Sequence, residues 1–214
     1  MTGNALRDAG TAALAPALSC LAQLATLELH GCNIGPDGAA ALAQSLPHLT
    51  ALTLLNLCRN TVGPSGAAAL APALGHLSRL AHLNLRDTGL RAGGAAALAA
   101  PLGRLTALNT LFLCSNGIGA GGAAALAAPL GRLTALTALR LSANHFDDAC
   151  LLHLTPGLAQ LTALRKLDFF TPTAGRWQNR LSTHAQAALY HGVPASVWHA
   201  SDCLSSERRL RESE

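Results

Sequence analysis

A leucine pattern that repeats every 28 residues is the feature that most limits how this chain can fold. Each copy follows the pattern Leu-x-x-Leu-x-Leu-x-x-(Asn/Cys)-x-(Ile/Leu/Val), and the clearest copy runs from Leu108 to Ile118. The copies begin at Leu24, Leu52, Leu80, Leu108, Leu136 and Leu164. Self-similarity at a fixed period of this length is typical of solenoids, in which each unit stacks on its neighbours.

The second half of each unit has a different spacing. Leu42, Leu46 and Leu49 lie at i, i+4 and i+7, which places them on one stripe of a helix. The same trio returns in the other units, so each unit predicts a short strand followed by a helix. Because no single unit can bury its own leucines, the units are expected to stack into an α/β solenoid with one parallel sheet.

We expect six parallel strands in this sheet, at Thr26–Leu29, Leu54–Leu57, His82–Leu85, Thr110–Leu113, Ala138–Leu141 and Lys166–Phe169. The helices carry a local conflict, because a proline in a helix interior costs roughly 3 kcal/mol. The prolines inside the predicted helices are Pro16, Pro72, Pro101, Pro129 and Pro156. We therefore expect these helices either to be short and irregular or to bend at each proline.

The asparagine position of the pattern has a physical explanation. Where the chain turns away from the strand, backbone N–H and C=O groups lose their ladder partners. An inward-pointing asparagine such as Asn116 can bond these groups, and stacked units then form a ladder of asparagines. Cys32 and Thr88 occupy this position in two other units and can supply part of the same bonding.

The unit, with the motif GxxGAxALAxxL after the strand, resembles the ribonuclease-inhibitor class of leucine-rich repeats over about Asn4 to Phe169. Similar repeats occur in Ran GTPase-activating proteins and in the sensor regions of nucleotide-binding immune receptors. The resemblance implies a horseshoe with a parallel sheet on its concave face and helices on its convex face. It also implies that a partner protein binds along the concave face.

The repeat register is lost after Phe169. We expect a leucine-rich-repeat domain over residues 4–170, a C-terminal cap over 171–200 and a disordered tail over 201–214. The cap region holds both tryptophans and the single tyrosine of the chain. Their large side chains would cover the leucines of the last unit, because the open end of a solenoid needs a cover. The alternative is that these aromatic residues form a binding patch.

The N-terminal side of the solenoid is expected to be open. Asn4-x-Leu6 is in register with Cys32-x-Ile34, so the strand that would precede Asn4 is missing. The first strand would then present unpaired backbone groups at its outer edge, and such an edge invites association with another chain.

The x positions of the leucine pattern face the concave side of the sheet, because side chains alternate across a strand. Residues 92–108 are identical to residues 120–136, yet the strands that follow carry Phe112 and Arg140 at the same position. A constant scaffold with one variable face suits recognition, and aromatic and arginine side chains are enriched in binding hot spots. We therefore expect a partner-binding site formed by Asn56, Asn84, Arg86, Phe112, Cys114 and Arg140.

Two alternatives to this site stay open. The concave positions could be solvated and vary without a function. A second candidate surface is a weakly basic stripe near the C-terminal ends of the helices, although cations there usually only complement the helix dipole. The stripe consists of Cys20, His48, His76, Arg104, Arg132 and Gln160.

Composition and spacing argue against several other classes of partner. The net charge of +4 comes without a dense basic run, so we expect no nucleic-acid partner. Residues 9–27 are uncharged, but Thr11–Leu18 returns almost unchanged as Ala67–Leu74, which indicates repeat structure and no membrane segment. The six cysteines form no CxxC pair and lack zinc-ligand spacing, so we expect free thiols, no metal and a cytoplasmic protein.

Catalytic motifs are missing as well: the glycine pairs lack a P-loop lysine, and neither HExxH nor GxSxG occurs. We therefore expect a non-enzymatic protein-binding module without a cofactor, or a fragment of a larger leucine-rich-repeat receptor or scaffold. The resemblance to Ran GTPase-activating proteins makes a GTPase activator the alternative, with Arg59, Arg86 and Asp87 as candidate contacts. A truncated product with no function of its own is a third hypothesis.

Overall fold

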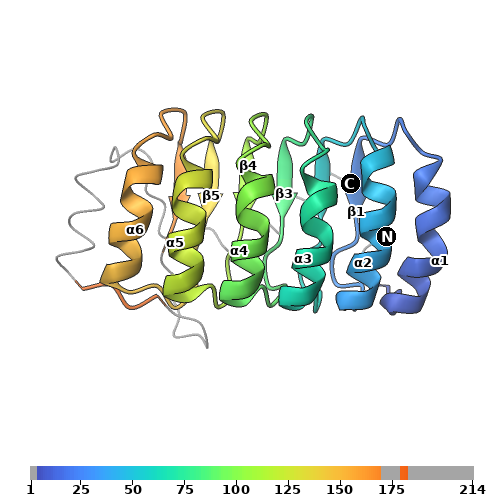
Figure 1. Cartoon of the computed structure of the whole chain (residues 1–214), viewed down its shortest axis with the longest axis horizontal. Coiled ribbons are helices and arrows are strands. Elements are labelled where there is room, and N and C mark those ends of the chain that lie inside the picture. The colour runs from blue at the N-terminus through green and yellow to red at the C-terminus, as the bar shows by residue number, and fades with distance from the viewer. Residues whose placement is uncertain (1–3, 170–178, 183–214) are drawn as a thin grey trace, which may run out of the picture.

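Strands and helices alternate along the chain, with one strand and one helix in each complete repeat unit. The structure, a computed structural model, describes residues 4–169 and 179–182, and Figure 1 shows a row of helices packed against a row of strands. The sheet is parallel and open, with its strands in chain order. The fold is therefore the α/β leucine-rich-repeat solenoid that the sequence predicts.

The elements follow the repeat closely. The strands are β1 (Thr26–Glu28), β2 (Leu54–Asn56), β3 (His82–Asn84), β4 (Thr110–Phe112), β5 (Ala138–Arg140) and β6 (Lys166–Asp168). The helices in the described part of the chain are α1 (Arg7–Ser19), α2 (Pro36–Ser45), α3 (Gly63–Leu74), α4 (Arg91–Leu102), α5 (Gly119–Leu130) and α6 (Asp148–Leu158), with a short 3-10 helix η1 (Leu46–His48) after α2.

All six predicted strands are present, and each ends one residue earlier than predicted. The residue beyond still bonds to the next strand: the backbone N–H of Leu29, for example, donates to the Asn56 carbonyl oxygen at 2.9 Å. The register pairs equivalent residues of successive units, such as Leu27 with Leu55, so columns of side chains run across the sheet. Within the described residues, β1 forms one edge of the sheet and pairs only with β2.

Leucines fill the space between the sheet and the helices. The central leucine of every strand is buried, and so are all three leucines of each trio from α2 to α6. The third leucine nevertheless lies outside the helix: α3 ends at Leu74, whereas Leu77 lies in the turn before β3. The prediction of one continuous helical stripe is wrong for this position, because the chain must leave the helix there to reach the next strand.

The five prolines lie in the last turn of their helices. Pro72 is followed within α3 by Ala73 and Leu74, and the helix still has 12 residues. A proline removes the hydrogen bond to the carbonyl four residues earlier, and at most three helical residues follow each of these prolines, so little helix is left for a bend to displace. Of the two alternatives, short helices are therefore wrong, since the five helices that contain these prolines have between 11 and 13 residues.

The expected asparagine ladder is present and joins successive units. Asn116 is 1% exposed, and its Nδ2 donates to the carbonyl oxygen of Leu113 in its own unit and to that of Leu85 in the unit before. Its Oδ1 accepts from the backbone N–H groups of Thr88 and Leu90, at 3.0 and 3.2 Å. One buried amide thus satisfies backbone groups in two units at once.

The ladder continues beyond the point where the sequence pattern breaks. The Asn179 Oδ1 accepts from the backbone N–H groups of Asn144 and Phe146, at 2.8 and 3.0 Å, and its Nδ2 donates to the Phe169 carbonyl oxygen at 2.7 Å. Asn179 therefore occupies the asparagine position of a further unit, 35 residues after Asn144 instead of 28. Apart from residues 179–182, the predicted cap and tail lie outside the described residues.

Small residues let neighbouring helices approach closely. A Cβ added to Gly122 in α5 would clash with Cγ2 of Ile118 and lie 3.0 Å from Cβ of Ala95 in α4. Gly121 is exposed, and the nearest atom to a Cβ added there is Cβ of Ala92, at 3.6 Å. The spacing between these helices, and with it the spacing of the units, therefore requires glycine at the inner position only.

We expect Asn116→Ala to lower the free energy of unfolding by about 1–3 kcal/mol, because buried backbone groups of two units lose their partner. Asn56→Ala is the matched control, since the half-buried Asn56 accepts from the Cys58 backbone N–H within its own unit. This control substitution should lower the free energy of unfolding by less than about 0.5 kcal/mol. Urea unfolding followed by circular dichroism measures both, and equal losses would show that the ladder is not the source.

Gly122→Ala should destabilise the fold by about 1–3 kcal/mol, because the added methyl group overpacks the contact between α4 and α5. Gly121→Ala makes the same chemical change one residue earlier in α5 and should stabilise the fold by about 0.5–1 kcal/mol through helix propensity. Thermal unfolding of the two variants compares them directly. A higher melting temperature for both variants would mean that the contact between α4 and α5 can accommodate an added methyl group at Gly122.

Candidate protein-binding face

The face of the sheet that is turned away from the helices, the concave face, carries three columns of side chains. The central column consists of Glu28, Asn56, Asn84, Phe112, Arg140 and Asp168, as the strand register pairs them. The preceding column consists of Thr26, Leu54, His82, Thr110, Ala138 and Lys166. The following column consists of His30, Cys58, Arg86, Cys114 and Ser142.

Phe112 and Arg140 form the centre of this face. They are register partners on β4 and β5, and Cζ of Arg140 lies 4.5 Å from the centroid of the Phe112 ring. A guanidinium over an aromatic face is attracted by the ring quadrupole, by about 0.5–1 kcal/mol at an exposed site. Both side chains are half-buried, so the stacked pair offers an ordered surface that is apolar and cationic at once.

The two predicted asparagines have a structural contact that the sequence did not indicate. The Asn84 Oδ1 accepts from the Arg86 backbone N–H at 3.1 Å, and the Asn56 Oδ1 accepts from the Cys58 backbone N–H at the same distance. Each side chain thus supports the chain just beyond its own strand. In the first case this contact positions the backbone of Arg86, which is itself half-buried on the concave face.

Cys114 differs from the other predicted site residues. It lies in the column where the sequence places it, but only 1% of it is exposed. A side chain at this depth packs below the surface and offers a partner almost no area. The five predicted residues that reach the surface are Asn56, Asn84, Arg86, Phe112 and Arg140.

Acidic side chains mark both ends of the central column. Glu28 lies on β1, and Asp168 on β6 is the register partner of Arg140. The Oδ2 of Asp168 accepts from the Ser142 hydroxyl at 3.2 Å. Lys166 lies on the same strand face two residues earlier. The predicted site did not include these end residues, although the repeat already places Glu28 and Asp168 in the central column.

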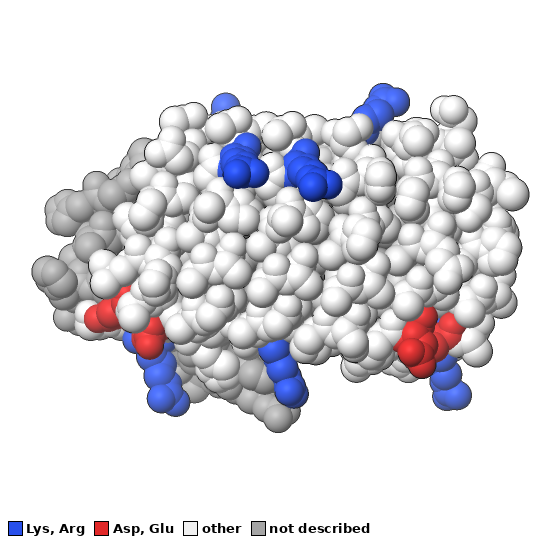
Figure 2. Space-filling view, in the orientation of Figure 1, with Lys and Arg blue, Asp and Glu red and all other residues white. Residues whose placement is uncertain are grey.

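The helix side offers less to a partner. Figure 2 shows that charged side chains lie near the upper and lower edges of this face and leave the middle of the helices uncharged. The residues of the basic stripe are all exposed, yet the arginines lie along glycines of the preceding unit. A Cβ added to Gly75 would lie 3.6 Å from a guanidinium nitrogen of Arg104, and one on Gly103 would lie 3.4 Å from Cδ of Arg132. These stems therefore cover backbone between the units.

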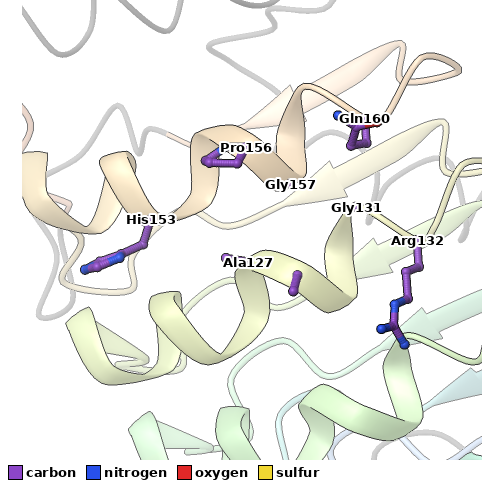
Figure 3. Close-up of a pocket in the computed structure, with 8 residues that line it drawn as sticks. Ala127, Gly131, Arg132, His153, Pro156, Gly157 and Gln160 are labelled. Atoms are coloured by element: carbon purple, nitrogen blue, oxygen red, sulfur yellow. The ribbon is translucent and has the colours of Figure 1, made fainter.

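A shallow hollow of about 400 Å³ lies between α5 and α6 on this side (Figure 3). Half of its lining residues are alanine or glycine, and Arg132, His153 and Gln160 stand around it. The two helices are so close that a Cβ added to Gly157 would clash with the Ala127 carbonyl oxygen. The hollow thus follows from small side chains on closely packed helices.

Titratable side chains are sparse and scattered in the described part of the chain. No group of three or more His, Cys, Asp or Glu side chains among them could hold a metal ion. The five described cysteines form no disulfide with one another, and burial raises the pKa of the Cys150 thiol to about 11, which keeps it protonated and unreactive at neutral pH. Hydrogen bonds from Cys150 lower the pKa of Asp147, which caps α6 by accepting from the Cys150 backbone N–H at 2.9 Å.

None of the described helices combines the length and the apolar character that crossing a membrane requires.

Comparison with known proteins supports a leucine-rich-repeat family. The model of the family described as Leucine Rich repeat matches residues 24–43 and 47–71. Among solved structures, an internalin from Listeria monocytogenes is similar at 17% identity, over 86% of this chain and 76% of that chain, with a TM-score of 0.29. Comparison with curated proteins found no match. Leucine-rich repeats are protein-interaction modules, so the family match is consistent with a chain that binds another protein.

Proposed function

We propose that this chain is a non-enzymatic protein-binding module whose concave face holds the partner. The observation that carries the proposal is the stacked pair of Phe112 and Arg140 at the centre of that face. Binding hot spots cluster near the middle of an interface and are enriched in aromatic and arginine side chains. A half-buried aromatic ring held by an arginine has the chemistry and the position of such a hot spot.

The size of the concave face suits a protein partner. Six strands at a spacing of about 4.8 Å make a wall roughly 25 Å long, which can hold a helix or the flank of a small domain. Leucines and small residues make up the scaffold, and polar, charged and aromatic residues replace one another along the central column of this wall. We propose in addition that the module is part of a larger leucine-rich-repeat receptor or scaffold of the ribonuclease-inhibitor class.

A cytoplasmic location is part of the proposal. It is supported by the five described cysteines, which form no disulfide with one another, since disulfides are rare in reducing compartments.

No specific observation favours a GTPase activator. Arg59 and Asp87 are exposed and have positive φ angles of 55° and 53°. Such a strained backbone would suggest a functional role if it occurred at one position only. Ser115 and Ala143 adopt the same conformation at the equivalent positions of their units, with φ of 61° and 55°. The strained backbone is therefore a property of the turn in each repeat unit, and it does not indicate a catalytic role for Arg59 or Asp87.

We expect Phe112→Ala and Arg140→Ala each to weaken partner binding by about 1–3 kcal/mol, because both changes remove the central contact. The stability of the fold should change little, since both side chains point away from the leucine core. His76→Ala and Arg132→Ala, on the helix side, are the controls and should leave binding nearly unchanged. A partner recovered by pull-down, followed by calorimetric titration with the four variants, provides the affinities.

Two outcomes would count against this function. Loss of binding in the helix-side variants with no effect at Phe112 and Arg140 would move the binding surface to the basic stripe. Faster GTP hydrolysis by a small GTPase in the presence of the chain would replace the binding module with an activator.

A further inference from the structure

We propose that the concave face selects a protein segment that carries a carboxylate beside an apolar side chain. This inference rests on the proposed function and adds the chemistry of the partner. It comes from the way charge is distributed over the three columns of the concave face.

The middle of the concave face is positively charged. Across β2 to β5, the three columns contain only two charged side chains, and both are arginines, Arg86 and Arg140. The remaining positions of these strands are uncharged polar or apolar residues, with His82 as the single additional titratable base. The charged side chains at the centre of the face, where contacts contribute most to affinity, are therefore basic.

The two arginines flank Phe112. Arg140 lies on β5, the next strand on one side, and Arg86 follows β3, the next strand on the other side. Strands two positions apart are roughly 10 Å apart, so one segment lying across β4 can reach both guanidinium groups. An apolar side chain of that segment would pack on the Phe112 ring while an adjacent carboxylate pairs with an arginine.

The stacking of Arg140 suits it to a carboxylate. The ring contact at 4.5 Å occupies a face of the guanidinium, while the N–H groups that bind carboxylates project from its edge. The stack also limits the rotation of the side chain, so less conformational entropy is lost when a carboxylate binds.

The neighbouring Asp168 competes for the same guanidinium. It is the register partner of Arg140, and the Ser142 hydroxyl donates to its Oδ2 at 3.2 Å. An acidic segment is repelled by this carboxylate, and a basic segment is attracted by it. Removal of the Asp168 charge therefore changes affinity in opposite directions for the two kinds of partner.

A library of random linear peptides displayed on phage and selected against the full chain tests the inference. We expect enriched peptides to carry Asp or Glu next to an aromatic or aliphatic residue and to lose affinity in Phe112→Ala. Arg86→Gln and Arg140→Gln should each weaken the synthesised peptides roughly 5- to 50-fold. Affinity should also fall as the NaCl concentration rises, because the attraction is electrostatic.

Asp168→Asn provides the test of sign. An acidic segment should bind about 2- to 5-fold more tightly to this variant. Glu28→Gln is the matched control, since it removes the acid at the opposite end of the central column and should change affinity by less than about 2-fold.

The outcomes separate the inference from the function on which it rests. Peptides that depend on Phe112 but lack acidic residues, or that bind Asp168→Asn more weakly, would overturn the inference and leave the binding face in place. Failure to enrich any peptide that depends on Phe112 would count against both. Enrichment of basic peptides whose affinity depends on Glu28 and Asp168 would also overturn the inference, because the face would then select basic segments.

Discussion

Hydrogen bonds from buried asparagine amides to the backbone of the preceding unit are the interaction on which the rest of this solenoid depends. The turn after each strand leaves N–H and C=O groups that the sheet cannot pair, and burying them without partners costs about 1–3 kcal/mol each. Asn116 bonds the Leu113 carbonyl in its own unit and the Thr88 N–H in the unit before. Because the turns are held in this way, equivalent strand residues stay in register, and the register is what brings Phe112 beside Arg140.

The scaffold and the recognition face use different residues, so one can vary without disturbing the other. Residues 92–108 and 120–136 are identical, and α4 and α5 pack through the same small residues. The strands that follow these segments differ where their side chains leave the core, with Phe112 on one and Arg140 on the other. The resulting face has arginines at its centre and carboxylates at its ends, and such a pattern discriminates between partners by repulsion as well as attraction.

Much of the fold could be predicted because burial imposes a strict spacing. The central leucine of a strand must point inward, so the strands were predicted to within one residue. The third leucine of each trio was misplaced because it is buried like its helical neighbours, and periodicity cannot distinguish a helix from the turn that follows it. The sequence pattern did not identify Asn179 as a ladder residue, because the additional residues before it break the 28-residue period. Its hydrogen bonds to the backbone of Asn144 and Phe146 nevertheless match those of the other ladder asparagines.

The sequence by itself determined the repeat, the order and direction of the strands, and the column to which each concave residue belongs. These follow from local alternation and from a fixed period, which need no knowledge of neighbouring side chains. Only the tertiary structure decided that Cys114 lies below the surface and that Arg140 stacks on Phe112. Depth and stacking depend on the volumes and rotamers of residues in adjacent units, which a pattern along one chain does not encode.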